Sequence, residues 1–275
     1  MKFCFVLLVA LGLCGCSTAR IIYENADTYL KWKAASYFDL HSEASEEMDE
    51  RIDAFMGWHR SQALPKYAAL IDEAAGRFAR GLSREDLVWG YDAALTHGRE
   101  SALAAAERIA PLLDRLTAAQ ITHLEQQFAE DNRRFARENL RGSERERRKR
   151  RTERNVERLE DWVGRLSKAQ VERVAQYSQR APLLEELRSR EHKRLQAELV
   201  AILRAREAKK RLPEAAANWE RGREPAYVAA LEAARREYFA MALDIDKSLS
   251  REQRSRALGQ LKRWSDDFRI LARAR

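Results

Sequence analysis

Cysteine is scarce in this chain and is confined to its start. The three cysteines are Cys4, Cys14 and Cys16, and no other follows in the 275 residues. Everything after residue 16 therefore lacks a thiol for a disulfide bond, a catalytic nucleophile or a zinc ligand. Proline and glycine are also few, with 5 and 11 residues, so the sequence contains little that breaks a helix.

Signatures of strands and of catalysis are missing as well. No segment alternates apolar and polar residues as a half-buried strand does. The chain has no Gly-x-Ser-x-Gly elbow, phosphate loop, Gly-x-Gly-x-x-Gly or His-Glu-x-x-His motif. Its histidines, at 41, 59, 97, 123 and 192, stand far apart without the spacing of metal ligands. The sequence thus predicts no enzyme, no catalytic residue, no metal site and no cofactor beyond a covalent lipid.

The lipid is predicted from the only long apolar run, residues 3–13. This run is shorter than the roughly 20 residues that span a bilayer. It follows Lys2 and leads into Leu13, Cys14, Gly15 and Cys16, which is typical of a secretory signal ending in a lipobox. The alternative is ordinary secretion with a chance cysteine.

The lipobox resembles that of bacterial lipoproteins. The resemblance implies a signal peptide over residues 1–15, cleavage before Cys16, a lipid on the Cys16 sulfur and a tether over residues 16–23. It places the protein in the bacterial cell envelope, anchored to a membrane and facing the periplasm. Ser17, where an Asp would signal retention in the inner membrane, favours the outer membrane.

The rest of the chain has the composition of helices. Ala, Leu, Glu, Arg, Lys and Gln dominate it. Apolar residues recur every three or four positions, as in Met48, Ile52, Phe55 and Met56, or in Leu258, Leu261, Trp264, Phe268 and Leu271. We expect an all-α fold of kinked helices in a bundle or cradle. The prolines at 65, 111, 182, 213 and 225 should each kink or restart a helix.

Four segments carry the pattern of a helix start, in which Ser or Thr caps the helix and an acidic or amide residue three positions later reaches back to the cap. In each segment a Leu precedes the cap. The segments contain Leu82, Ser83 and Asp86; Leu116, Thr117 and Gln120; Leu166, Ser167 and Gln170; and Leu249, Ser250 and Gln253. In the fourth, Arg254 stands where an apolar partner for the Leu is expected.

A longer motif occurs twice. Trp58, Arg60, Pro65 and Tyr67 match Trp219, Arg221, Pro225 and Tyr227, with one residue deleted before the second proline. Two copies indicate two related helical halves, residues 24–140 and 159–275, joined by a basic helix or linker at 141–158. Within the motif, His59 corresponds to Glu220, which favours a polar contact at a helix kink over catalysis.

The stretch from Arg141 to Arg158 holds nine basic and four acidic residues. Its densest part is Arg147, Arg148, Lys149, Arg150 and Arg151. In an exported protein such a run is a poor indication of nucleic-acid binding. It predicts either a solvated helix or linker, or a patch that contacts phosphates of phospholipid or lipopolysaccharide.

Two resemblances extend beyond the lipobox. Residues 25–27, Trp32-Lys33, residues 37–40, Trp58-His59-Arg60 and Leu64-Pro65-x-Tyr67-Ala68 resemble an uncharacterised family of proteobacterial lipoproteins, which has no known function. The Leu-Thr-x-x-Gln helix starts resemble those of the Spy and CpxP group of small helical periplasmic proteins, of which Spy is a chaperone that works without ATP.

The aromatic residues Tyr23, Tyr29, Trp32, Tyr37 and Phe38 crowd the segment nearest the expected lipid anchor. They either pack against the bundle or lie partly at the membrane interface. For the whole chain we expect a non-enzymatic lipoprotein that binds another polypeptide in the envelope, as a chaperone-like holder or an assembly adaptor. The alternative is an envelope-structural protein that docks on anionic lipid through its basic stretch.

Overall fold

The structure is a computed structural model that describes residues 16–274 and, from residue 20 on, their side chains. This part of the chain is entirely helical, so the expected all-α fold is confirmed. The lipobox residues Leu13, Cys14 and Gly15 lie outside the described residues. None of the described helices is long and apolar enough to cross a membrane.

The elements follow one another with short connections. In chain order they are α2 (Cys16–Glu24), α3 (Ala26–Phe38), α4 (Ser42–Trp58), the π-helical turn η2 (His59–Ala63), α5 (Leu64–Ala79), α6 (Arg84–Leu113), α7 (Ala118–Asn139), α8 (Glu144–Val163), α9 (Lys168–Arg180), α10 (Glu185–Arg204), α11 (Ala208–Ala217), α12 (Pro225–Ser248) and α13 (Arg251–Arg273).

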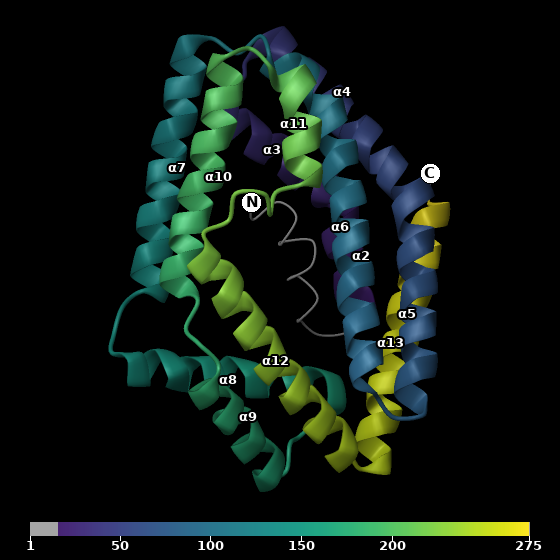
Figure 1. Cartoon of the computed structure of the whole chain (residues 1–275). Coiled ribbons are helices and arrows are strands. Elements are labelled where there is room, and N and C mark those ends of the chain that lie inside the picture. Colours follow the sequence, from purple (N-terminus) through teal and green to yellow (C-terminus); the bar gives the residue numbers. More distant parts are fainter. Residues whose placement is uncertain (1–15, 275) are drawn as a thin grey trace.

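The helices form two sides joined at one end (Figure 1). The pair α7 and α10 forms one side, and α5, α13 and α6 form the other. Helices α8 and α9 pack together at one end of the molecule. Helix α12 runs obliquely between the two sides and packs mainly on α9. This arrangement leaves much of the surface of α12 uncovered.

Two apolar cores hold the arrangement together. The larger one joins residues of α3, α4 and α6 with Ile202, Leu203 and Leu271 from the later part of the chain. The smaller one lies where α8, α9, α12 and α13 meet, around Val174 and Met241. The larger core therefore mixes the two related halves expected from the repeated motif.

All four predicted helix starts form capping boxes, at α6, α7, α9 and α13. A fifth box, Ser143 with Glu146, begins α8 and was missed in the sequence because it lies inside the charged stretch. Of the prolines, Pro225 begins α12 and Pro65 lies in the first turn of α5.

The remaining prolines have other positions. Pro111 and Pro213 lie inside α6 and α11, so they neither begin nor end a helix. Pro182 lies in the connection between α9 and α10. The expectation of a kink or restart at each proline thus fits best at the starts of helices, as for Pro65 and Pro225. In the first turn of a helix a backbone N–H has no partner within the helix, so its absence in proline costs no hydrogen bond.

Two of the boxes are joined to each other. The Gln170 amide donates to Gln253 Oε1 at 3.0 Å, and the Gln253 amide donates to Gln170 Oε1 at 3.1 Å. Gln253 also donates to the Arg165 carbonyl at 3.0 Å, and Gln170 donates to the Ser248 carbonyl at 3.2 Å. Gln170 is only 2% exposed. Residues that cap their own helices therefore also fasten α9 to α13.

Arg254 explains the irregular fourth helix start. Its guanidinium pairs with buried Asp246 at 2.9 Å and donates to the Phe78 carbonyl at 2.7 Å. The other Asp246 oxygen accepts from the Leu82 N–H at 3.0 Å. Arg254 therefore links the turn between α12 and α13 to the turn between α5 and α6, a long-range contact that an apolar side chain there could not make.

Gln170→Ala should lower the free energy of unfolding by about 2 to 3 kcal/mol, because it removes part of a capping box and the bonds that buried Gln170 makes to Gln253 and to the Ser248 carbonyl. The matched control is Gln120→Ala, which removes a cap at a more exposed helix start and should cost about 1 kcal/mol. Chemical denaturation followed by circular dichroism measures both. Equal losses in the two variants would contradict the role assigned to the Gln170–Gln253 pair.

Candidate functional site

One exposed apolar surface lies beside α12. Tyr91 of α6 lies against Phe239 of α12, with 6.4 Å between ring centroids, and remains partly exposed. Tyr238 of α12 contacts Tyr177 of α9 at 5.9 Å. Val88, one turn before Tyr91 on α6, is exposed as well. We call Val88, Tyr91 and Tyr238 the α12 surface.

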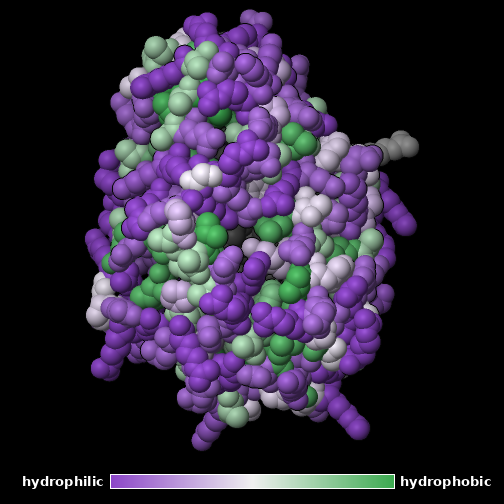
Figure 2. Space-filling view, viewed as in Figure 1, coloured by the Kyte–Doolittle hydropathy of each residue, from purple (hydrophilic) through white to green (hydrophobic). Residues whose placement is uncertain are grey.

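Tyr238 is 46% exposed. Desolvation by burial raises the pKa of its hydroxyl above the usual value. The face of the molecule seen in Figure 2 is hollowed near its centre, and hydrophobic side chains gather around the hollow.

Positively charged side chains lie beside the same region. Exposed Arg235 lies over the Tyr91 ring, 4.9 Å from its centroid, and Arg236 beside it is exposed. The α12 surface thus combines aromatic rings, an aliphatic side chain and guanidinium groups. Tyrosine and arginine are enriched where proteins bind other proteins, since they give large contact areas and strong hydrogen bonds.

A second cluster centres on His59 in the π-helical turn η2. Its side chain is 2% exposed, and its Nδ1 lies 2.8 Å from the Tyr23 hydroxyl. Phe55 and Tyr67 pack against its ring, with centroids 5.7 and 5.5 Å away. Burial lowers the pKa of His59 to about 4, so the imidazole is neutral at neutral pH.

The turn itself has a local cause. Pro65 has no N–H to donate, and its ring would crowd the carbonyl four residues earlier in an ordinary helix. The chain widens before Pro65, where the Leu64 N–H donates to the His59 carbonyl five residues back. This turn places His59 inward, where it makes the polar contact expected at a helix kink. Its partner Tyr23 could not be predicted from the sequence.

The two copies of the repeated motif have different local structures. The first, with Trp58, Arg60, Pro65 and Tyr67, runs through η2 into α5, and the second, with Trp219, Arg221, Pro225 and Tyr227, forms the turn between α11 and α12. Both copies reach the same stretch of α6. Tyr67 bonds to Ser101 at 2.6 Å, while Glu220 pairs with Arg99. The shared arginines differ too, since Arg60 lies over the Tyr23 ring and Arg221 pairs with Glu214 at 2.5 Å.

Arginines of the basic run donate hydrogen bonds to other parts of the protein. Arg148 donates to the carbonyls of Ser178, Gln179 and Ala181 at 2.9, 2.6 and 3.0 Å. Arg151 donates to the carbonyls of Ala181 and Pro182 at 2.7 and 2.8 Å and to that of Ser178. These groups are the free carbonyls at the end of α9, so the two guanidinium groups cap that helix.

The rest of the run is partly engaged. Arg147 pairs with Glu186 at 3.1 Å, and Arg150 donates to the Arg141 carbonyl at 2.6 Å. Lys149 is exposed and lies 3.8 Å from Glu153. The run is thus helical, and its arginines face α9 and α10 more than solvent. Contact with phosphates of phospholipid or lipopolysaccharide stays a prediction.

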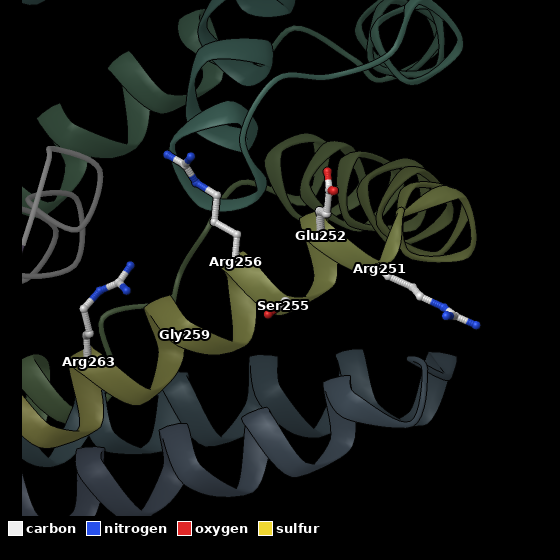
Figure 3. A pocket seen from close by; sticks show the side chains of 6 residues that line it. All are labelled: Arg251, Glu252, Ser255, Arg256, Gly259 and Arg263. Atoms are coloured by element: carbon white, nitrogen blue, oxygen red, sulfur yellow. The ribbon is translucent and has the colours of Figure 1, made fainter.

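A different set of arginines faces solvent. An open groove of about 510 Å³ on α13 is lined by Arg251, Glu252, Ser255, Arg256, Gly259 and Arg263 (Figure 3). Within residues 16–274, neither Arg251 nor Arg256 has an acidic partner. Arg263 bonds to Gln260 on its own helix. Because these arginines are scattered along the sequence, no run of charge pointed to them.

The predicted lipid site falls at the edge of the described chain. Cys16 is the first residue of α2, and its side chain is not described. Among residues 16–274, no three or more His, Cys, Asp or Glu side chains are grouped to hold a metal ion.

The α12 surface could not be found in the sequence, because Tyr238 and the buried Phe239 are neighbours that the sequence does not distinguish.

The fold of the described residues is that of an all-α protein in which five helices begin with capping boxes. A family model, described as a family of unknown function (DUF6279), matches residues 36–227. The chain belongs to this family, since the match covers more than half of it. No curated protein and no solved structure matches the chain. The resemblances to lipoproteins and to the Spy and CpxP group stay predictions.

Protonation of His59 should destabilise the fold. An unfolded histidine titrates near pH 6.5 and the folded one near 4, so between these values the unfolded state binds more protons. The stabilisation is therefore complete above pH 6.5 and is lost as the pH falls towards 4, by up to about 1.4 kcal/mol per pH unit.

Urea denaturation at a series of pH values measures this slope. In His59→Gln the slope between pH 6.5 and 4 should fall by the contribution of one histidine. His41→Gln, which changes an exposed histidine, is the control and should leave the slope unchanged. An unchanged slope in His59→Gln would show that the buried imidazole does not titrate in this window.

Proposed function

We propose that this protein is a lipid-anchored envelope protein that faces the periplasm and binds other polypeptides, as a chaperone-like holder or an assembly adaptor. The observation that carries the proposal is the α12 surface, where Val88, Tyr91 and Tyr238 stay exposed. In a folded chain with two well-packed cores, an exposed aromatic surface is more useful for binding than for stability.

The chemistry of this surface favours a polypeptide over a small molecule. It is open and lies on α6 and α12, whereas small-molecule sites are enclosed cavities with converging polar groups. Tyrosine rings adapt to varied apolar side chains, and exposed Arg235 and Arg236 suit clients with acidic residues. Helix α12 has 24 residues and many of its side chains are exposed, which gives an extended segment room to lie along it.

The test is a client-aggregation assay with purified residues 17–275, which include both apolar cores. The protein should slow the aggregation of an unfolded client near equimolar ratio. The double variant Tyr91→Ser/Tyr238→Ser should weaken the effect several-fold, because it removes the two rings of the α12 surface. No effect of the unmodified chain at several-fold excess would count against the proposal.

Tyr29→Ser is the matched control for this assay. It removes an equally exposed tyrosine from α3, which belongs to a different part of the molecule. Its activity should equal that of the unmodified chain. Circular dichroism of each variant excludes unfolding as the cause of any loss. Equal loss in Tyr29→Ser would mean that general surface hydrophobicity acts, and not the α12 surface.

A second candidate function is docking on anionic lipid or lipopolysaccharide. The observation that favours it is the groove with Arg251, Arg256 and Arg263, whose guanidinium groups lack acidic partners within the described chain. The contact with anionic lipid would then lie on α13 and not on the basic run of α8. Phosphate groups suit such guanidinium groups because they accept paired hydrogen bonds.

Salt-sensitive binding to vesicles containing anionic lipid tests this candidate. Arg251→Gln/Arg256→Gln/Arg263→Gln should reduce vesicle binding at least several-fold. The control Arg145→Gln/Lys149→Gln changes exposed residues of α8 and should have little effect. Arg148→Gln/Arg151→Gln should instead lower stability, because the carbonyls at the end of α9 lose their donors. Vesicle binding that persists in the triple variant would remove the groove from consideration.

A further inference from the structure

The first two helices follow one another directly, with only Asn25 between them, and together we call them the rod. The Asn25 N–H donates to the Ile21 carbonyl at 3.2 Å, and the Tyr29 N–H donates to the Asn25 carbonyl at 3.1 Å. Asn25 itself has φ −103° and ψ 6°, outside the helical region, so α2 and α3 are two separate helices joined at this residue. Helical spacing therefore places side chains on a common face within each helix, and not across Asn25.

The rod has two apolar sides. Tyr23, Leu30 and Ala34 are buried in the larger core. On the other side, Ile21, Tyr29 and Trp32 are exposed, the last two by 48% and 62%. Tyr29 and Trp32 are three positions apart on α3, which places them on one face of that helix, and Ile21 is the most exposed of the described large apolar side chains of α2. We call Ile21, Tyr29 and Trp32 the outer face of the rod.

This face is unusual for a surface in contact only with water. Trp32 is the most exposed of the large apolar side chains in the described chain. Its ring and that of Tyr29 lie together, with centroids 6.0 Å apart. Lys33 extends beside them, its Nζ 5.8 Å from the Trp32 ring and 3.9 Å from the Tyr37 ring. Trp32 and Tyr29 therefore form an exposed aromatic pair, and the half-buried Lys33 lies between the Trp32 and Tyr37 rings.

This combination is the one favoured at the boundary between lipid headgroups and acyl chains. Amphipathic tyrosine and tryptophan rings concentrate at that depth, and lysine keeps its ammonium in water while its methylenes lie along apolar groups. The face also begins close to Cys16, the predicted site of lipid attachment. Trp32 is 16 residues from Cys16, or roughly 24 Å along a helix, so the whole face stays within reach of the anchor.

We propose that the outer face of the α2–α3 rod lies in the interface of the phospholipid bilayer that holds the lipidated Cys16. The rod then lies along the membrane, with Ile21, Tyr29 and Trp32 at headgroup depth and the larger core on its opposite side. The lipid holds the protein at the membrane, and this face sets the orientation of the helical body. The inference rests on the lipid anchor of the proposed function and not on its polypeptide binding.

The experiment uses the full lipidated protein in vesicles of phosphatidylcholine and phosphatidylglycerol. Mass spectrometry first measures the acyl chains on Cys16. Phosphatidylcholine brominated near the headgroup then quenches tryptophans at interface depth. In the unmodified protein, part of the tryptophan emission should be quenched. In Trp32→Phe, more than half of that quenchable part should be lost. Trp89→Phe, which changes a tryptophan of α6 stacked under Arg77 at 4.1 Å, is the matched control and should keep it.

The outcomes separate this inference from the proposed function. A lipidated protein without quenching, or equal quenching in Trp32→Phe and the unmodified protein, would overturn the membrane contact and leave the anchor in place. Trp32 that is shielded from iodide but not quenched by brominated lipid would show a protein on this face and would also overturn it. A protein without lipid on Cys16 would overturn the anchor and the inference together, whereas the aggregation assay with residues 17–275 would still test polypeptide binding.

Discussion

The reciprocal amide contact between Gln170 and Gln253 is the constraint on which the lower part of the molecule depends. Each glutamine closes the first turn of its own helix, and each also satisfies the other's side chain. The contact brings together the starts of α9 and α13, beside the smaller core. From this junction α13 runs along α5 and α12 runs along α9, so the position of α12 follows from it.

Arginine side chains form similar contacts at other helix ends. Arg148 and Arg151 satisfy the carbonyls that end α9, and Arg254 joins two turns through buried Asp246. A chain without disulfide bonds in its helical body must bring its helix ends together by hydrogen bonds and ion pairs of this kind. Burial lowers the pKa of Arg151, and the carbonyls that it contacts offset part of that cost. Arginines of the basic run, which the sequence presented as possible ligand-binding residues, thus stabilise the fold.

The predictability of each feature follows the range of the interactions involved. Capping boxes depend on residues three apart, so Ser83, Thr117, Ser167 and Ser250 were all recognisable in the sequence. The apolar stripe of Met48, Ile52 and Met56 was likewise recognisable in the sequence, and these residues are buried in the structure. The α12 surface was not, since whether Tyr238 or Phe239 is exposed depends on where α6 and α9 pass. The role of Arg151 was equally hidden, because its partners are about 30 residues away in the chain.

By itself, the sequence determined an all-α protein, four of its five capped helix starts and the absence of thiols beyond residue 16. These features arise from backbone propensity, side-chain periodicity and hydrogen bonds within one turn, all of which are local. Only the tertiary structure decided which arginines are free, which tyrosines stay open around α12, and which side of the first helical rod faces outward. Those outcomes depend on desolvation and packing between helices distant in the chain, and burial is a property of the assembled fold.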